Sequence, residues 1–166
     1  MSSFARIVAG LLAAAFITGG AMAATPEEMI KGAKGLDEAF LKAFNEHNAE
    51  AMGPLYWNSP ETVLMPPDMM VAKGHAAIMA SFAQMIATMK DCQLEMVESH
   101  NVPVGDVAVG WGLYKLTMAG PDGKPMEILG RYSDVKAERD GKWVYLVDHA
   151  SVPTPPPPAP EAAPKQ

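Results

Sequence analysis

Residues 140–151 read DGKWVYLVDHAS, a turn signal followed by a strand-like run and then by two adjacent titratable side chains. An Asp-Gly pair between apolar runs is a preferred two-residue connection of a β-hairpin, because glycine accepts a positive φ angle there. The strand after the turn should therefore pair antiparallel with residues of about 126–139. Side chains alternate along a strand, so the sequence predicts that Tyr145 and His149 share one face and that Asp148 lies on the other.

The order of the remaining elements places helices before most of the strands. A capping-box pattern at residues 25–28 predicts a helix over about 26–47, and Asn48 can cap a shorter one. Apolar residues three and four apart predict a further helix over about 75–90. Alternating segments predict strands at about 62–65, 92–100, 106–119 and 125–139, before the strand that ends the hairpin. This order is typical of an α+β fold, in which an antiparallel sheet wraps around helices.

Two glycines interrupt the predicted strand over 106–118. Gly110 and Gly112 share one face of this strand with Ala108 and Tyr114. A glycine inside a strand marks a kink or a close approach of another part of the chain. We therefore expect the sheet to bend here, with a helix packed against the face of small residues.

The N-terminal residues 1–23 have the pattern of a secretory signal peptide. Arg6 precedes an apolar run over residues 7–17, and small residues follow at the positions that a signal peptidase requires. The alternative is a retained membrane anchor, but the run is shorter than the about 20 apolar residues that span a bilayer. We predict cleavage near Ala23, which leaves a periplasmic or secreted protein without a membrane anchor.

The exported part divides into a domain and a tail. Residues 24–151 carry all of the predicted helices and strands and form one domain. Residues 152–166 are rich in proline and poor in apolar side chains, which predicts an extended, disordered and solvated tail. A polyproline ligand for a partner protein is the alternative interpretation.

Charge and composition exclude several classes of partner. The 166 residues carry a formal net charge of −6 and no basic run, which argues against nucleic acid and against an anionic membrane surface. Met65, Met69, Met70 and His75 could supply soft ligands for copper. Most of the other methionines lie on apolar helix stripes, where methionine fills the core. We therefore expect no metal and no cofactor.

Several short segments of the predicted domain occur in a characteristic order. They are Phe40 to Trp57, Val63 to Pro67, Gly74 to Ile78, Gly105 to Ala108, Gly130 to Tyr132, Asp140 to Trp143 and Asp148 to Ser151. Over residues 27–151 this order resembles the SnoaL-like and DUF4440 branch of the NTF2-like superfamily, which also contains the ketosteroid isomerases. The resemblance implies an α+β cone, in which a strongly curved antiparallel sheet and three helices enclose a pocket. It also implies a homodimer.

The resemblance allows the isomerase residues to be compared one by one. Isomerisation of this kind needs a carboxylate base and a hydroxyl or protonated acid that stabilises the enolate. Met65 falls at the position of the base, and Phe40 falls where the first helix would supply a tyrosine. The third position falls near Ser133 or Asp134. Two of the three roles are lost, so isomerisation by the usual residues is not expected.

Two other side chains are candidates for proton transfer. His149 is the first, because the unperturbed pKa of histidine, about 6.5, already lies near neutral pH. Asp148 is the second, either as a catalytic group or as a structural one. The two are neighbours on a strand and face opposite ways, so each could pair only with another strand, for example through Tyr132 or Asp134.

The residues expected to line the pocket are Tyr56, Trp57, Met65, Met70, Phe82, Trp111, Tyr114, Tyr132 and Asp134. They predict an exported protein that binds a small, largely apolar organic molecule. One alternative is a cyclase, hydratase or isomerase that uses His149 or Asp148 for proton transfer. The other is a homodimeric interaction module without chemistry.

Overall fold

The computed structural model describes residues 24–89, 91–120 and 122–153. The predicted signal peptide, residues 1–23, and all but the first two residues of the predicted tail lie outside these ranges. The helices are α1 (Pro26–Asn45), α2 (Ala49–Met52), the 3-10 turn η1 (Gly53–Leu55) and α3 (His75–Thr88). The strands are β1 (Val63–Met65), β2 (Ala72–Lys73), β3 (Gln93–Val104), β4 (Val107–Ala119), β5 (Pro125–Arg139) and β6 (Lys142–Ser151). Within the described ranges, no helix has the length and apolarity that a membrane crossing requires.

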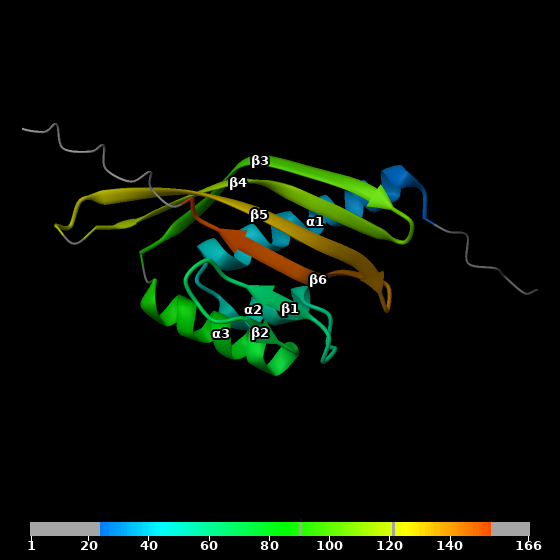
Figure 1. The fold of residues 1–166 in the computed structure, drawn as a ribbon, viewed down its shortest axis with the longest axis horizontal. Helices are drawn as coiled ribbons and strands as arrows, with labels where there is room; N and C mark the ends of the chain where they lie inside the picture. Colours follow the sequence, from blue (N-terminus) through cyan, green and yellow to red (C-terminus); the bar gives the residue numbers. More distant parts are fainter. Residues whose placement is uncertain (1–23, 90, 121, 154–166) are drawn as a thin grey trace, which may run out of the picture.

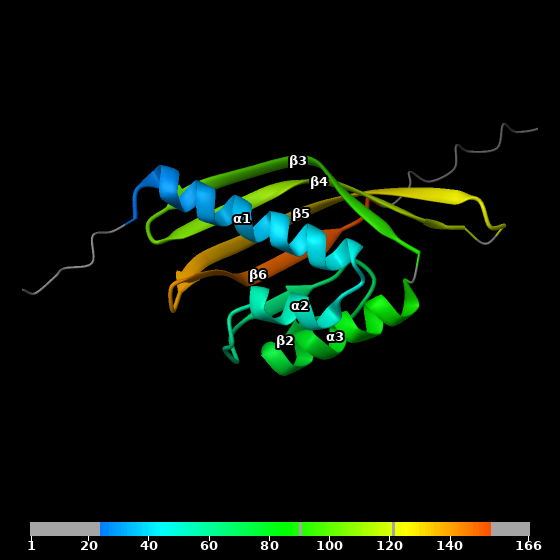
Figure 2. The same cartoon turned by 180° about the vertical axis from the view of Figure 1, so that it is seen from behind.

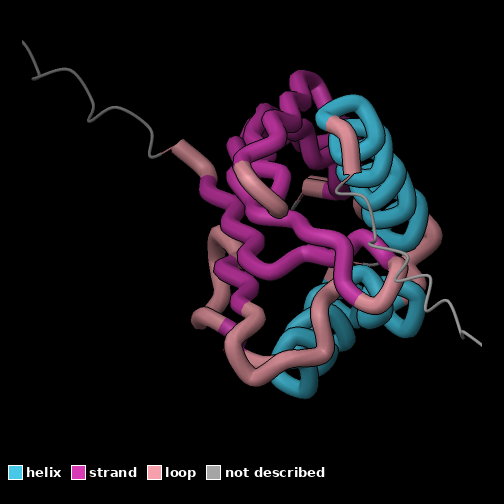
Figure 3. Tube along the Cα trace, turned by 90° about the vertical axis from the view of Figure 1, so that its right-hand side faces the viewer, coloured by secondary structure: helices cyan, strands magenta, loops and turns pink. Residues whose placement is uncertain are grey.

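The six strands form one curved, open sheet in the order β2-β1-β6-β5-β4-β3. Strands β3 to β6 are antiparallel neighbours, whereas β1 runs parallel to β6. Helix α1 lies across one face of the long strands, and α2 and α3 lie beside the short strands β1 and β2 (Figures 1 and 2). Seen from the end, the sheet curves around the side that carries the helices (Figure 3). The prediction of an α+β cone is confirmed, with one parallel pair at the junction of the short and long strands.

Helix α1 begins where its capping box predicts. The amide of Glu28 donates to the Thr25 hydroxyl at 3.3 Å, and the Glu28 carboxylate accepts from the Thr25 amide at 2.8 Å. The helix ends two residues earlier than predicted, and His47 beyond it has a positive φ of 53°. Its buried face consists of Met29, Ala33, Leu36, Asp37, Ala43 and Phe44. One member of this apolar stripe, Asp37, is therefore a buried carboxylate.

The β5–β6 hairpin forms as predicted, with positive φ angles of 52° at Asp140 and 72° at Gly141. Its register shifts farther along, because Lys136 pairs with Tyr145 whereas Val135 pairs with Val147. The extra residue is a β-bulge, and it reverses the alternation of side chains along β6. Tyr145 and Asp148 therefore face the same way, toward α1, and His149 faces away. The prediction that Tyr145 and His149 share one face of the sheet is wrong for this reason.

The glycines of β4 make the close approaches that the sequence predicts. A Cβ atom on Gly112 would lie 1.9 Å from the backbone oxygen of Glu98, beside a second bulge in β3. A Cβ atom on Gly110 would lie 2.3 Å from Asp134 Oδ1. Gly110 thus leaves room for polar side chains between the sheet and α1.

We expect Gly110→Ala to lower the free energy of unfolding by about 1–3 kcal/mol, because the added methyl group must displace a buried side chain. Urea denaturation measures this change. Gly35→Ala is the control, since a methyl group added to the exposed Gly35 of α1 would have no other atom within 4 Å. There alanine should stabilise the helix by up to about 1 kcal/mol. Equal effects of the two substitutions would contradict the packing described for Gly110.

Candidate functional site

A cavity of about 120 Å³ lies between the concave face of the sheet, α1 and α3. Its apolar walls come from Phe40, Phe44, Leu64, Pro66, Pro67, Phe82, Met85, Met89, Leu94, Met96, Tyr114, Leu116, Tyr132, Tyr145 and Ala150. Cavities of about 150 Å³ are large enough to bind benzene. The pocket is somewhat smaller than such a cavity, which limits a ligand enclosed in it to about the size of one small ring.

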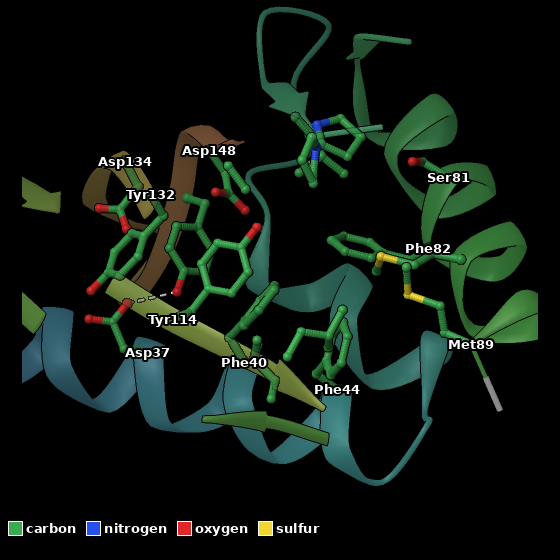
Figure 4. A pocket seen from close by; sticks show the side chains of 18 of the residues that line it. Asp37, Phe40, Phe44, Ser81, Phe82, Met89, Tyr114, Tyr132, Asp134 and Asp148 are labelled. Atoms are coloured by element: carbon green, nitrogen blue, oxygen red, sulfur yellow. Dashed lines mark hydrogen bonds between the residues drawn. The ribbon is translucent and has the colours of Figure 1, made fainter. Parts of the chain in front are cut away.

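Three of the four acidic side chains that line the pocket gather at one end. Asp37, Asp134 and Asp148 lie there beside Tyr114 and Tyr132, whereas Phe82 and Met89 lie at the other end (Figure 4). The three acids come from three elements, α1, β5 and β6. This gives the pocket one acidic end and one apolar end.

A buried lysine holds two of these acids together. Lys136 has no exposed surface, and its ammonium nitrogen lies 2.6 Å from Asp37 Oδ1 and 3.2 Å from Asp134 Oδ1. It donates a hydrogen bond to Asn101 Oδ1 at 2.8 Å and lies 5.5 Å from the centre of the Tyr145 ring. The network thus links α1, β3, β5 and β6.

Asp37 is the best-satisfied acid of the network. Its carboxylate accepts hydrogen bonds from the Tyr145 hydroxyl at 2.8 Å and from the Asn101 amide at 3.0 Å. These bonds add to the ion pair with Lys136. Hydrogen bonds and an opposite charge together stabilise an ionised carboxylate in a buried position.

Asp134 is less well satisfied. Its carboxyl is almost fully buried, and Oδ1 makes no hydrogen bond, because the 3.2 Å contact with Lys136 lacks hydrogen-bond geometry. Burial raises the pKa of Asp134 from 3.8 to about 7, with repulsion from Asp37 and Asp148 added and the attraction of Lys136 opposed to it. Asp134 therefore exchanges a proton near neutral pH.

Asp148 accepts a hydrogen bond from the hydroxyl of Tyr56. Burial raises the pKa of the Asp148 carboxyl, and the Asp37 charge adds to the rise, while the Tyr56 bond and Lys136 oppose it. Burial also raises the pKa of Tyr132 to about 12 and holds the pKa values of Tyr56 and Tyr145 well above 10. These hydroxyls remain hydrogen-bond donors at neutral pH.

The structure brings five of the predicted site residues into the pocket, namely Phe82, Tyr114, Tyr132, Asp134 and Asp148. Tyr56 is 2% exposed and lies behind Asp148, which it orients through its hydroxyl. It therefore supports the acidic end without lining the cavity.

The other predicted residues lie outside the pocket. Met65 pairs in register with His149, so Leu64, one residue earlier, takes the inward position. Met70 is 88% exposed in the loop before β2. Trp57 lies after the 3-10 turn, and the Arg139 guanidinium lies 5.6 Å from the centre of its ring.

Two predicted residues lie on the outer face of the sheet, opposite α1. Trp111 is 43% exposed there and stacks on His100 with ring centres 5.4 Å apart. The exposed His149 lies on the same face, in a shallow depression shared with Trp111 and Arg131. The bulge in β6 places His149 there and turns Asp148 into the pocket.

Asp37 and Lys136 were not predicted as site residues from the sequence. Both had a weak signal, since Asp37 interrupts an otherwise apolar helix stripe, and Lys136 lies two residues after Asp134 on the same strand face. Neither signal identifies the partner, because α1 and β5 are far apart in sequence.

Comparison with known proteins identifies the family to which this chain belongs. The family model of the SnoaL-like domain matches residues 38–146, so the chain belongs to the SnoaL-like family. A search of curated proteins gave no significant match.

Solved structures share the fold. A Streptomyces avermitilis protein of the NTF2-like family, described as a dehydratase, is 18% identical with a TM-score of 0.71, covering 78% of this chain and 99% of its own. A Caulobacter vibrioides protein with a cystatin-like fold is 22% identical with a TM-score of 0.67. The match covers 77% of this chain and 92% of the Caulobacter chain. A Xanthomonas campestris protein is 26% identical with a TM-score of 0.62, and the match covers 72% of this chain and 84% of the Xanthomonas chain. It is described as a calcium/calmodulin-dependent protein kinase II association domain. This fold is compatible with ligand binding or with isomerase-like chemistry. The residues of the site, and not the fold, discriminate between these two functions.

We expect Lys136→Met to lower the free energy of unfolding by about 3–5 kcal/mol, because it leaves the buried Asp37 charge without its cation. Urea denaturation measures the loss. Adding Asp37→Asn should restore part of it, since the unpaired charge is then gone. Lys115→Met is the control, because Lys115 pairs with exposed Glu95 at 2.8 Å, a contact worth less than about 1 kcal/mol. Equal losses at the two lysines would contradict the buried ion pair.

The raised pKa of Asp134 predicts a pH dependence of stability. Between the ordinary value of 3.8 and the folded value of about 7, the folded state binds more protons than the unfolded state. The Asp134 contribution to the free energy of unfolding should therefore fall as pH rises through this interval. Asp134→Asn does not titrate there, while Asp37, Lys136 and Asp148 around it remain. The stability of Asp134→Asn relative to the natural protein should grow from pH 4 to pH 7.5 in urea denaturation, and a constant difference would refute the assignment.

Proposed function

We propose that this protein binds a small, largely apolar organic molecule in the pocket, with a hydrogen-bonding group of the ligand against Asp134 and Asp148. The observation that carries the proposal is the division of the pocket into apolar walls and one acidic end. Ligand sites in proteins combine a mostly apolar lining with a few polar groups that fix the orientation of the ligand.

The two acids offer a ligand both kinds of hydrogen bond. A carboxyl group that holds its proton donates to a carbonyl or hydroxyl oxygen, and an ionised one accepts from a donor. Asp134 changes between these states near neutral pH. The acidic end can thus orient a ligand, while the aromatic and methionine side chains supply most of the contact area.

Calorimetry with 2-phenylethanol, a neutral molecule with one ring, tests the binding proposal. We expect saturable binding, weakened about three- to tenfold by Met85→Ala, because a smaller side chain removes apolar contacts from the pocket. Met126→Ala is the matched control, since Met126 is 40% exposed and lies away from the pocket. Binding that is absent, or equally weakened by both substitutions, would contradict the proposal.

Proton transfer in the same pocket is the second candidate function. It is favoured by the pKa of Asp134 near 7, since a general acid or base works best when its pKa is close to the operating pH. A cyclase, hydratase or isomerase would then use Asp134 and Asp148, with Tyr56 orienting Asp148. His149, the alternative proton carrier, faces away from the pocket. NMR can follow the exchange of the α-hydrogens of cyclohexanone in heavy water. If Asp134 transfers the proton, the rate of exchange should fall in Asp134→Asn and stay the same in His149→Gln.

Export and dimer formation are also part of the proposal. The pattern of residues 1–23 supports a periplasmic or secreted protein, and mass spectrometry of the mature chain would show whether it begins after Ala23. A homodimer is supported by the exposed apolar side chains of the outer face, which are Val102, Val104, Trp111, Leu113 and Leu129. Sedimentation velocity measures the oligomeric state.

A further inference from the structure

The charges around the pocket are strongly unbalanced. Four carboxylates line it, from Asp37, Asp68, Asp134 and Asp148, and among its described lining residues none is a lysine, arginine or histidine. The neighbouring Lys136 is fully buried and lies 2.6 Å from Asp37. One ammonium group neutralises at most one of the acids, so the pocket has a negative potential whenever more than one of them is ionised.

Asp134 has a buried carboxylate oxygen without a hydrogen bond. The side chain is 2% exposed, and Oδ1 has no hydrogen-bond partner. Lys136 Nζ lies 3.2 Å from it, whereas the shorter contacts of this ammonium group are those with Asp37 and Asn101. A buried carboxylate oxygen without a donor is costly, which favours a ligand that brings an N–H group.

Aromatic rings line the pocket, and two of them lie at its acidic end. The lining includes Phe40, Phe44, Phe82, Tyr114, Tyr132 and Tyr145. Tyr114 and Tyr132 lie beside the three acids of the pocket end (Figure 4). The face of an aromatic ring attracts a cation, and the attraction is larger when the cation is removed from water. Rings and carboxylates therefore favour the same kind of group.

We infer that the ligand is a small organic amine, which places its ammonium group against Asp134 and Asp148 and its apolar body between α1 and α3. This inference rests on the proposed binding function and names the chemical class of the ligand. An ammonium group supplies hydrogens to the unpartnered Asp134 oxygen and positive charge to the excess of carboxylates. A neutral ligand supplies no charge, and a carboxylate ligand adds to the repulsion.

Three molecules that share a phenyl ring and a short chain test the inference. They are 2-phenylethylamine, 2-phenylethanol and phenylacetate, measured by calorimetry on the full mature protein at pH 8, where Asp134, with a pKa of about 7, is mostly ionised. We expect the amine to bind at least about tenfold more tightly than the alcohol, a difference of about 1.4 kcal/mol. Phenylacetate should bind most weakly.

Substitutions test whether the acidic end of the pocket causes the preference for the amine. Asp134→Asn should reduce the preference for the amine over the alcohol to less than about threefold, because the amide carries no charge that could attract the ammonium group. Asp106→Asn makes the same change of net charge in the exposed β3–β4 turn and should retain the full preference. Circular dichroism shows whether each variant is folded.

The possible results separate the two proposals. If the alcohol binds as tightly as the amine, the amine inference is wrong and the binding function stands. If none of the three molecules binds, both proposals fail. An amine preference that survives in Asp134→Asn overturns the assignment to Asp134. The comparison of the three molecules on the natural protein decides the ligand class even if a variant does not fold.

Discussion

The burial of the Lys136 ammonium is the constraint on which the candidate site depends. An ion removed from water is stable only when opposite charge and hydrogen bonds surround it. Here Asp37 comes from α1, Asp134 from β5 itself and Asn101 from β3, with the Tyr145 ring of β6 alongside. The same contacts that stabilise the charge therefore fix α1 against the long strands and define one end of the pocket.

That arrangement leaves more acid than the lysine can neutralise. Asp37 receives the short ion pair and two hydrogen bonds, whereas Asp134 receives a longer contact and keeps one oxygen free. Burial raises the pKa of Asp134 to about 7, and the attraction of Lys136 opposes this rise only in part. A proton, or a cation supplied by a ligand, relieves the same repulsion. Structural stability and the proposed preference for an amine thus have a common electrostatic origin.

Family membership and fold leave this chemistry open. The Streptomyces and Caulobacter structures are 18% and 22% identical to this chain, a level at which the shared feature is the fold. NTF2-like proteins place different side chains around a similar pocket, so the function depends on the residues at the site. In this chain those residues are acids and aromatic rings.

The sequence by itself determined the cap of α1, the Asp-Gly hairpin, the order of the elements and the α+β class, because these depend on local contacts and periodicity. Phe82, Tyr114, Tyr132, Asp134 and Asp148 could be predicted as pocket residues from the same periodicity and from the family resemblance. Only the tertiary structure decided that Asp148 enters the pocket with Tyr145 while His149 leaves it, because one bulged residue in β6 reverses the alternation. It also decided the pairing of Asp37 with Lys136, since a contact between distant segments depends on how a helix lies on a sheet, and no local pattern specifies that.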